Sequence, residues 1–137
     1  MITKQVWKIG DCLNLMHDLS DKSIDLILTD PPYGVNYSKW DSLLSLEWFY
    51  LSLVKAKTVA FTPGLMNMYK YPEPDCMIAI VRPGSIQHQK KGGGFSHWEP
   101  VLVYGEHLPN VDMVIVRAQT DDPNNGHPCP KSLEMYS

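Results

Sequence analysis

The chain has 137 residues, a length typical of a single domain. Hydrophobic residues make up 44% of the chain and charged residues 20%, so it can bury a core and is not a disordered tail. A formal net charge of −3 argues against a protein that binds nucleic acid by charge alone, but not against an enzyme with a local basic patch.

Cysteine content and hydropathy indicate the cellular compartment in which the protein is expected. The three cysteines form no CxxC pattern, which excludes a disulfide framework and favours a reducing compartment. The first residues show no apolar signal-peptide core. The longest apolar run, Cys76–Val81, is far shorter than the ~20 residues that a membrane helix needs. We therefore expect a soluble cytoplasmic protein that does not associate with a membrane.

The amino-terminal half alternates between short strands and helices. Gln5–Ile9 is predicted as a strand, and Cys12–Leu19 as a short helix with apolar residues on one side. A second strand is predicted at Ile24–Thr29. Asp41 is the expected N-cap of the longest helix, Ser42–Ala56, whose apolar residues occupy a broad face.

The carboxy-terminal half contains four further apolar runs. They are predicted as strands over Thr58–Phe61, Met77–Val81, Pro100–Tyr104 and Met113–Arg117. Leu65–Lys70 is predicted to form one or two helical turns, and residues 84–96 a polar, glycine-rich loop. The last two strands are expected to pair with each other through the connection Gly105–Asn110.

This order of elements predicts the fold class. Strands that alternate with helices and end in a strand pair indicate an α/β fold, with a mostly parallel sheet and an antiparallel edge. No linker of biased composition divides the chain, so we expect a single domain over residues 1–137.

The most informative motif is Thr-Asp-Pro-Pro-Tyr-Gly at residues 29–34. It follows the predicted strand, and the carboxyl ends of strands are where open α/β sheets bind ligands. The Asp30 carboxylate and the Pro31 carbonyl offer two acceptors for the hydrogens of an exocyclic base amine, and Pro32 fixes the backbone that aims the second one. Tyr33 offers a flat face on which an extruded base can stack.

With both hydrogens of the amine engaged, its lone pair returns to nitrogen and can attack a methyl sulfonium held in line, without a strong base. The alternative is that Asp-Pro-Pro-Tyr is merely a turn after a strand, because Asp-Pro and Pro-Pro commonly form turns.

Three separated motifs resemble DNA N6-adenine and N4-cytosine methyltransferases, most of all those with circularly permuted motifs, including phage-borne ones. The first runs from Gly10 through Asp-Pro-Pro-Tyr to Gly34. The second is His-Trp-Glu-Pro-Val-Leu-Val-Tyr-Gly at 97–105, and the third is His-Pro-Cys-Pro-Lys at 127–131. Thr58–Phe61 with Pro63-Gly64 looks like the next strand of that family.

The resemblance covers nearly the whole chain and implies a fold and an activity. The fold would be a Rossmann-like, S-adenosylmethionine-dependent methyltransferase sheet. The activity would be methyl transfer to an exocyclic amine in double-stranded DNA, as in restriction–modification. Asp before Pro-Pro-Tyr favours N6 of adenine as the target, with N4 of cytosine as the second choice.

The resemblance also assigns roles to residues. Asp30, Pro31, Pro32 and Tyr33 match the catalytic motif, and by the resemblance Asp30 would also lie near the methionyl part of the cofactor. Asp11, followed by Cys12, matches the acid that accepts from the adenine amine of S-adenosylmethionine; its alternative role is an N-cap for the helix at 12–19. Further residues match a motif on the cofactor side of the sheet: His127, Pro128 and Lys131. The alternative for His127 is an ordinary loop histidine.

The sequence departs from the family after its third motif. No Phe-x-Gly-x-Gly cofactor loop is present, and Gly92-Gly93-Gly94 lacks the flanking strand and helix of a nucleotide loop. Ser132 stands where the family prefers proline. We therefore expect an incomplete catalytic domain with an open sheet edge. Three explanations stay open: a truncation, a split enzyme whose second chain supplies the glycine-rich half, and a homo-oligomer that covers the edge.

Residues 76–98 contain no acid and are predicted to bind DNA. Arg82, Lys90 and Lys91 are the expected phosphate contacts, and a solvated surface loop is the alternative. The histidines and cysteines match no common zinc spacing, so no metal is expected. Two other functions stay open: a non-catalytic fragment or partner subunit that binds DNA or protein, and an amino methyltransferase that acts on RNA.

Overall fold

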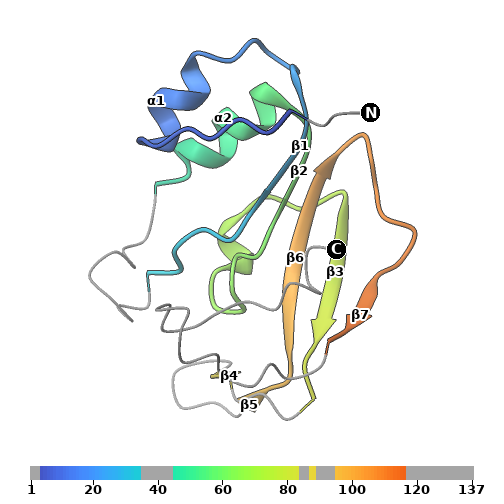
Figure 1. Cartoon of the computed structure of the whole chain (residues 1–137). Coiled ribbons are helices and arrows are strands. Elements are labelled where there is room, and N and C mark those ends of the chain that lie inside the picture. Colours follow the sequence, from blue (N-terminus) through green and yellow to red (C-terminus); the bar gives the residue numbers. More distant parts are fainter. Residues whose placement is uncertain (1–3, 35–44, 84–86, 89–94, 117–137) are drawn as a thin grey trace.

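The computed structural model describes residues 4–34, 45–83, 87–88 and 95–116. In this part of the chain, two helices lie on one face of a five-stranded mixed sheet, which confirms the α/β class (Figure 1). The helices are α1 (Cys12–His17) and α2 (Glu47–Lys55). No helix of the described residues is long and apolar enough to cross a membrane.

The sheet has the strand order β1-β2-β6-β3-β7. The bounds of its strands are β1 Ile24–Thr29, β2 Ala56–Phe61, β3 Cys76–Val81, β6 Trp98–Gly105 and β7 Met113–Ile115. A separate antiparallel pair is formed by β4 (Gln87–His88) and β5 (Phe95–Ser96), and η1 (Met68–Lys70) is a single 3-10 turn.

The strand directions correct the predicted topology. β1 and β2 are parallel, and so are β3 and β7, whereas β6 runs antiparallel to both of its neighbours, β2 and β3. Four strands therefore run in one direction, and the antiparallel strand lies inside the sheet. The predicted antiparallel edge is wrong, and so is the predicted pairing of the last two strands.

Burial explains why β6 is internal. Its residues from Glu99 to Tyr104 are all buried. After Glu99 the strand is a continuous uncharged run, which is typical of strands that are covered on both faces of a sheet. β7 instead exposes Met113 and Ile115, which suits its place at an edge of the described sheet. Val101 and Val103 of β6 pack on one face of the sheet, and Leu102 and Tyr104 pack on the other.

The helices cover the face to which Leu102 and Tyr104 belong. Trp48 and Phe49 of α2 insert into an aromatic cluster with Phe61, Tyr71 and Tyr104, where the ring centroids of Phe49 and Tyr104 are 4.9 Å apart. Most of these rings meet edge to face, the arrangement that aromatic quadrupoles prefer. This cluster anchors α2 and β2, and so sets the position of the chain that leaves β2.

The observed α2 is shorter than predicted. It begins at Glu47, and Ala56 already has extended backbone because it pairs with Ile24 as the first residue of β2. The predicted N-cap Asp41 lies outside the described residues. β1 has the predicted bounds, and β2, β3 and β6 are each longer than predicted by one to three residues.

The predicted strand at Gln5–Ile9 is wrong. Residues 4–9 have no strand hydrogen bonds within the described part of the chain, and Trp7 is 88% exposed. Alternating apolar residues show only that a segment fits a sheet, because a strand also needs a neighbouring strand to pair with.

Smaller differences concern the turns and the end of the described chain. Only Met68–Lys70 of the predicted turns at Leu65–Lys70 is helical, and the predicted loop at 84–96 contains the short pair β4 and β5. Arg117, the predicted last residue of the final strand, lies outside the described residues.

Candidate active site

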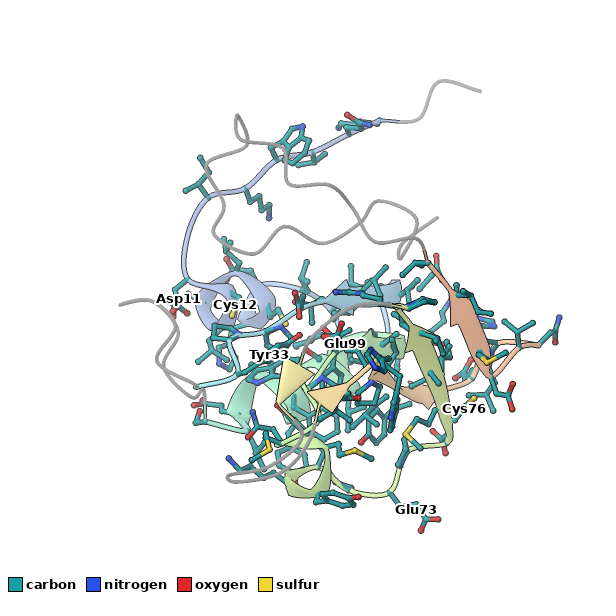
Figure 2. The ribbon with its side chains drawn as sticks, turned by 90° about the horizontal axis from the view of Figure 1, so that it is seen from below. Asp11, Cys12, Tyr33, Glu73, Cys76 and Glu99 are labelled. Atoms are coloured by element: carbon teal, nitrogen blue, oxygen red, sulfur yellow. The ribbon has the colours of Figure 1, made fainter. Side chains whose placement is uncertain are left out.

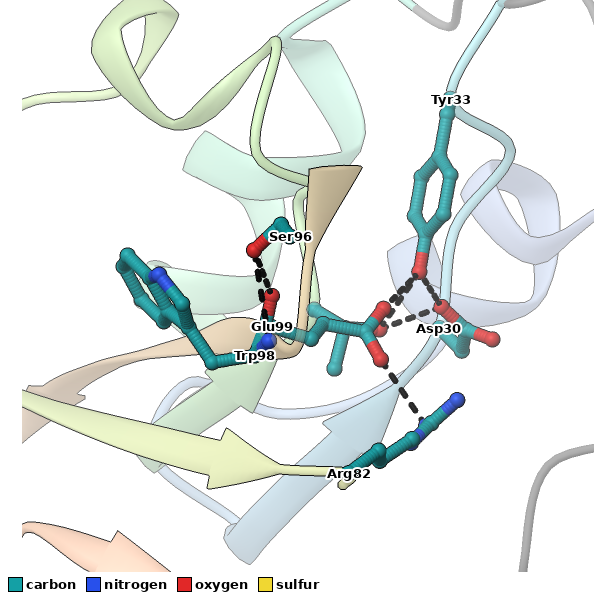
Figure 3. A network of polar contacts seen from close by, with 7 residues as sticks. Asp30, Tyr33, Arg82, Ser96, Trp98 and Glu99 are labelled. Atoms are coloured by element: carbon teal, nitrogen blue, oxygen red, sulfur yellow. Dashed lines mark hydrogen bonds and ion pairs between the residues drawn. The ribbon is translucent and has the colours of Figure 1, made fainter. Parts of the chain in front are cut away.

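Polar side chains from four strands meet at one end of the sheet, where β1, β2 and β3 finish and β6 begins. Asp30 directly follows β1, Thr62 follows β2, and Arg82 follows β3. Since β6 runs in the opposite direction, its second residue, Glu99, starts at the edge where the other three strands end. Figure 3 shows Asp30 and Glu99 on either side of the Tyr33 hydroxyl group, with Arg82 beside Glu99.

The Tyr33 hydroxyl is the centre of this network. Its oxygen lies 2.6 Å from Asp30 Oδ1 and 2.7 Å from Glu99 Oε1. It also lies 3.3 Å from Thr62 Oγ1, and the Thr62 hydroxyl in turn donates to Asp30 Oδ1. Residues from three different strand ends thus meet at one phenol oxygen.

Glu99 is held in place by an ion pair. Its Oε2 lies 2.9 Å from Arg82 Nη2, and the two side chains are only 2% and 15% exposed, respectively. A carboxylate so deeply buried requires a compensating charge and hydrogen bonds. The backbone N–H of Arg82 also donates to the carbonyl of His97, at 2.7 Å, which ties the end of β3 to the start of β6.

A tight turn leads the chain into β6. The Ser96 hydroxyl donates to the Trp98 carbonyl at 3.0 Å and accepts from the Trp98 backbone N–H at 3.3 Å (Figure 3). Ser96 itself is buried. This turn holds the backbone just before Glu99, and Arg82 holds its carboxylate. Both ends of the Glu99 side chain are therefore positioned.

The ring and backbone of Tyr33 are also anchored. Asn67 Nδ2 donates to the Tyr33 carbonyl at 2.7 Å. The ring packs on Gly64, where an added Cβ would lie only 3.2 Å from Cγ and Cδ2 of Tyr33. Gly64 also has a φ of +72°, so both its conformation and its contact favour glycine.

Burial raises the pKa of Tyr33 far above its usual range, and the nearby Glu99 and Asp30 carboxylates raise it further. The phenol therefore stays neutral at physiological pH and keeps its hydroxyl hydrogen.

The motif residues differ in exposure. Asp30 is exposed, Pro31 is buried, and Pro32 and Tyr33 are half-buried. Both hydrogen bonds named above fall on Oδ1 of Asp30, and Figure 3 shows its second oxygen directed away from Tyr33 and Glu99. The site therefore presents a solvent-accessible carboxylate beside an aromatic ring of fixed orientation.

The candidate cofactor residues are only partly described. Asp11 caps α1, since its Oδ1 accepts from the backbone N–H groups of Leu13 and Asn14 at 2.9 and 3.2 Å. This confirms the N-cap role, and the cofactor role of Asp11 stays a prediction. Cys12 is exposed beside it at the start of α1 (Figure 2). Three further candidates, His127, Pro128 and Lys131, lie outside the described residues.

Of the three candidate DNA contacts, the structure describes only Arg82. Arg82 is engaged with buried Glu99 and is largely covered, so its predicted phosphate contact gains no support. Lys90 and Lys91 lie outside the described residues. Within the described ranges, no three His, Cys, Asp or Glu side chains are placed to hold a metal ion together.

Four residues of this site were not predicted from the sequence: two that join its hydrogen-bond network and two that support Tyr33. Glu99 and Thr62 contribute oxygens, and Gly64 and Asn67 hold Tyr33. One signal was available for Glu99, because it is the lone charged residue in the otherwise uncharged run 98–105.

No protein-family model matches the chain.

Proposed function

We propose that the chain is an S-adenosylmethionine-dependent DNA methyltransferase that acts on an exocyclic base amine, N6 of adenine first and N4 of cytosine second. The observation that carries the proposal is the exposed Asp30 carboxylate at the carboxyl end of β1, held by the Tyr33 and Thr62 hydroxyls. The carboxyl ends of the strands are where open α/β sheets bind ligands.

The chemistry follows from the needs of the amine. Its lone pair is delocalised into the base, so it attacks only when acceptors engage its two hydrogens. Asp30 supplies one acceptor and the Pro31 carbonyl the second. The ring of Tyr33, which packs on Gly64 and whose backbone carbonyl is held by Asn67, is the stacking surface for the extruded base. A surface that is fixed before the base arrives costs less ordering on binding.

The cofactor would supply a methyl group on a sulfonium. Asp30 fits a place beside the positively charged methionyl part, because its carboxylate is exposed at the strand end. By the resemblance, Asp11, Cys12, His127, Pro128 and Lys131 would complete the cofactor site. A Rossmann-like fold is part of the proposal, and the four strands of common direction support it. Lys90 and Lys91 are the proposed contacts to DNA phosphates.

The test is methyl transfer from labelled S-adenosylmethionine to duplex DNA of mixed sequence. The DNA is then digested to nucleosides, and N6-methyladenine and N4-methylcytosine are identified by mass. A parallel reaction with structured RNA decides between the DNA- and RNA-directed activities. The assay is run with the chain alone and with the product of any neighbouring gene that encodes a glycine-rich cofactor segment.

Asp30→Ala should abolish transfer without unfolding the protein, because the side chain is exposed and outside both core clusters. Asp25→Ala is the matched control, since Asp25 is an exposed acid on the same strand whose partner is Lys57 at 2.7 Å. Transfer by the Asp30 variant at the wild-type rate would refute the role of that carboxylate.

A non-catalytic subunit is the second candidate. Among the described strands β1 lies at an edge, and its Leu26 and Leu28 are 53% and 45% exposed, an arrangement that suits contact with another chain. Calorimetry with S-adenosylmethionine separates the two functions, because a binding-only subunit gives no heat even at millimolar ligand. Light scattering shows whether the chain associates with itself.

A further inference from the structure

Two carboxylates compete for one hydrogen in the candidate active site. The Tyr33 oxygen lies within 2.7 Å of both Asp30 Oδ1 and Glu99 Oε1, yet a phenol has a single hydrogen to donate (Figure 3). Burial and the two acids raise the pKa of Tyr33, so this hydrogen stays on the phenol. At any moment, its donation to one carboxylate weakens its donation to the other.

Glu99 is a hydrogen-bond acceptor that is held in one position. Its Oε2 is directed to Arg82 at 2.9 Å, which leaves Oε1 on the side of Tyr33. The side chain is only 2% exposed, so it cannot turn into solvent. Asp30, in contrast, is exposed and accepts at the same oxygen from Thr62. The two acceptors therefore differ in mobility and in access to an incoming ligand.

We propose that Glu99 is a positioning residue that draws the Tyr33 hydroxyl hydrogen away from Asp30, so that Asp30 can accept from the target amine. This inference rests on the proposed function. Two hydroxyl hydrogens bound at Oδ1 withdraw negative charge from the whole Asp30 carboxylate, which lowers its capacity to accept from a third donor at the outward-directed oxygen as well. When Tyr33 donates to Glu99 instead, Asp30 recovers that capacity, and the ring keeps its orientation because the phenol oxygen stays anchored.

The kinetic test is a double-mutant cycle of Glu99→Gln and Tyr33→Phe in the whole chain. The Glu99→Gln amide lacks the negative charge that attracts the hydroxyl hydrogen, so this hydrogen returns to Asp30. We expect kcat to fall by roughly 10- to 100-fold, the range for a misplaced reacting group, with little change in KM for DNA. With Tyr33→Phe already present, Glu99→Gln should cost about twofold or less, because the interaction it removes is gone.

An equal loss in both backgrounds would overturn the proposal, since Glu99 would then act by a route other than Tyr33. Glu99→Asp guards against misfolding of the amide variant: it keeps a negative charge for Arg82 but shortens the reach to Tyr33. It should lower kcat in the same way, and wild-type kcat in this variant would also count against the proposal.

A spectroscopic readout is independent of methyl transfer. With 13C at the ζ carbon of tyrosine, the Tyr33 resonance is assigned by its loss in Tyr33→Phe. Glu99→Gln should move this resonance, whereas Glu73→Gln, an equal charge change at an exposed site away from Tyr33, should not (Figure 2). An unmoved resonance in Glu99→Gln would refute the hydrogen bond to Glu99. A moved resonance in a protein that transfers no methyl group would instead refute the proposed function and, with it, the positioning role.

Discussion

Replacing Arg82 by methionine tests the ion pair on which the candidate active site is built. Arg82→Met keeps a long apolar stem but removes the guanidinium that lies 2.9 Å from Glu99 Oε2. Glu99 then remains as a buried carboxylate without its opposite charge. The change affects the stability of the fold itself, so it can be measured without an activity assay.

The expected magnitude follows from the burial of the pair. Breaking a buried ion pair by removing one partner costs about 3–5 kcal/mol, because the remaining charge keeps its full desolvation penalty. Glu99 is 2% exposed, which places it in this class, but Tyr33 still donates to it at 2.7 Å. We therefore expect a loss near the lower limit, about 3 kcal/mol, which corresponds to a decrease in Tm of roughly 10 °C.

The assay is urea unfolding of the whole chain, in which the transition is monitored by tryptophan fluorescence and by far-UV circular dichroism. Lys57→Met is the matched control, because its 2.7 Å pair with Asp25 lies at the surface, and this variant should leave the unfolding free energy unchanged. Arg82→Met combined with Glu99→Gln should be more stable than Arg82→Met alone, since no buried charge remains. An unchanged unfolding free energy in Arg82→Met would refute this account of the buried pair.

Three further predictions concern the fold and its dependence on pH. Gly105→Ala should cost more than about 2 kcal/mol of unfolding free energy, since φ is +120° and the new Cβ would collide with the Lys57 carbonyl oxygen; wild-type stability would refute it. Asp11→Ala should cost about 1 kcal/mol and Asp11→Asn less, because asparagine also caps helices; equal losses would show that Asp11 stabilises by charge alone. Burial raises the pKa of Tyr104 to about 12, so the folded state retains a proton that the unfolded state loses above its lower pKa. The unfolding free energy should therefore fall as pH rises from about 10 towards 12, and Tyr104→Phe should weaken that slope; an unchanged slope would contradict the assignment.

The candidate active site combines rigid and accessible parts. Tyr33 and Glu99 are held by Gly64, Asn67 and Arg82, whereas Asp30 is exposed at the end of its strand. Such a division suits a site in which one group meets the ligand and the surrounding groups keep it in place.

Local signals in the sequence determined several features that the structure confirms. Apolar β-branched residues and leucines determined β1 with its observed bounds, and Asp11 determined the start of α1, because strand propensity and N-capping depend on neighbouring residues. The Asp-Pro-Pro-Tyr motif was likewise placed at a strand end by the run of apolar residues that precedes it. Each of these features involves only a few consecutive residues.

Only the tertiary structure decided which segments meet. The contact between Tyr33 and Glu99 joins residues 66 positions apart, and it exists because β6 enters the sheet between β2 and β3 in the opposite direction. The same pairing excluded the predicted hairpin of the last two strands, and the lack of a neighbouring strand in the described chain left Gln5–Ile9 without sheet hydrogen bonds. The periodicity of apolar residues indicates which side chains can be buried. The packing of the whole core determines which strands pair. The same strand pairing also places Arg82 beside Glu99.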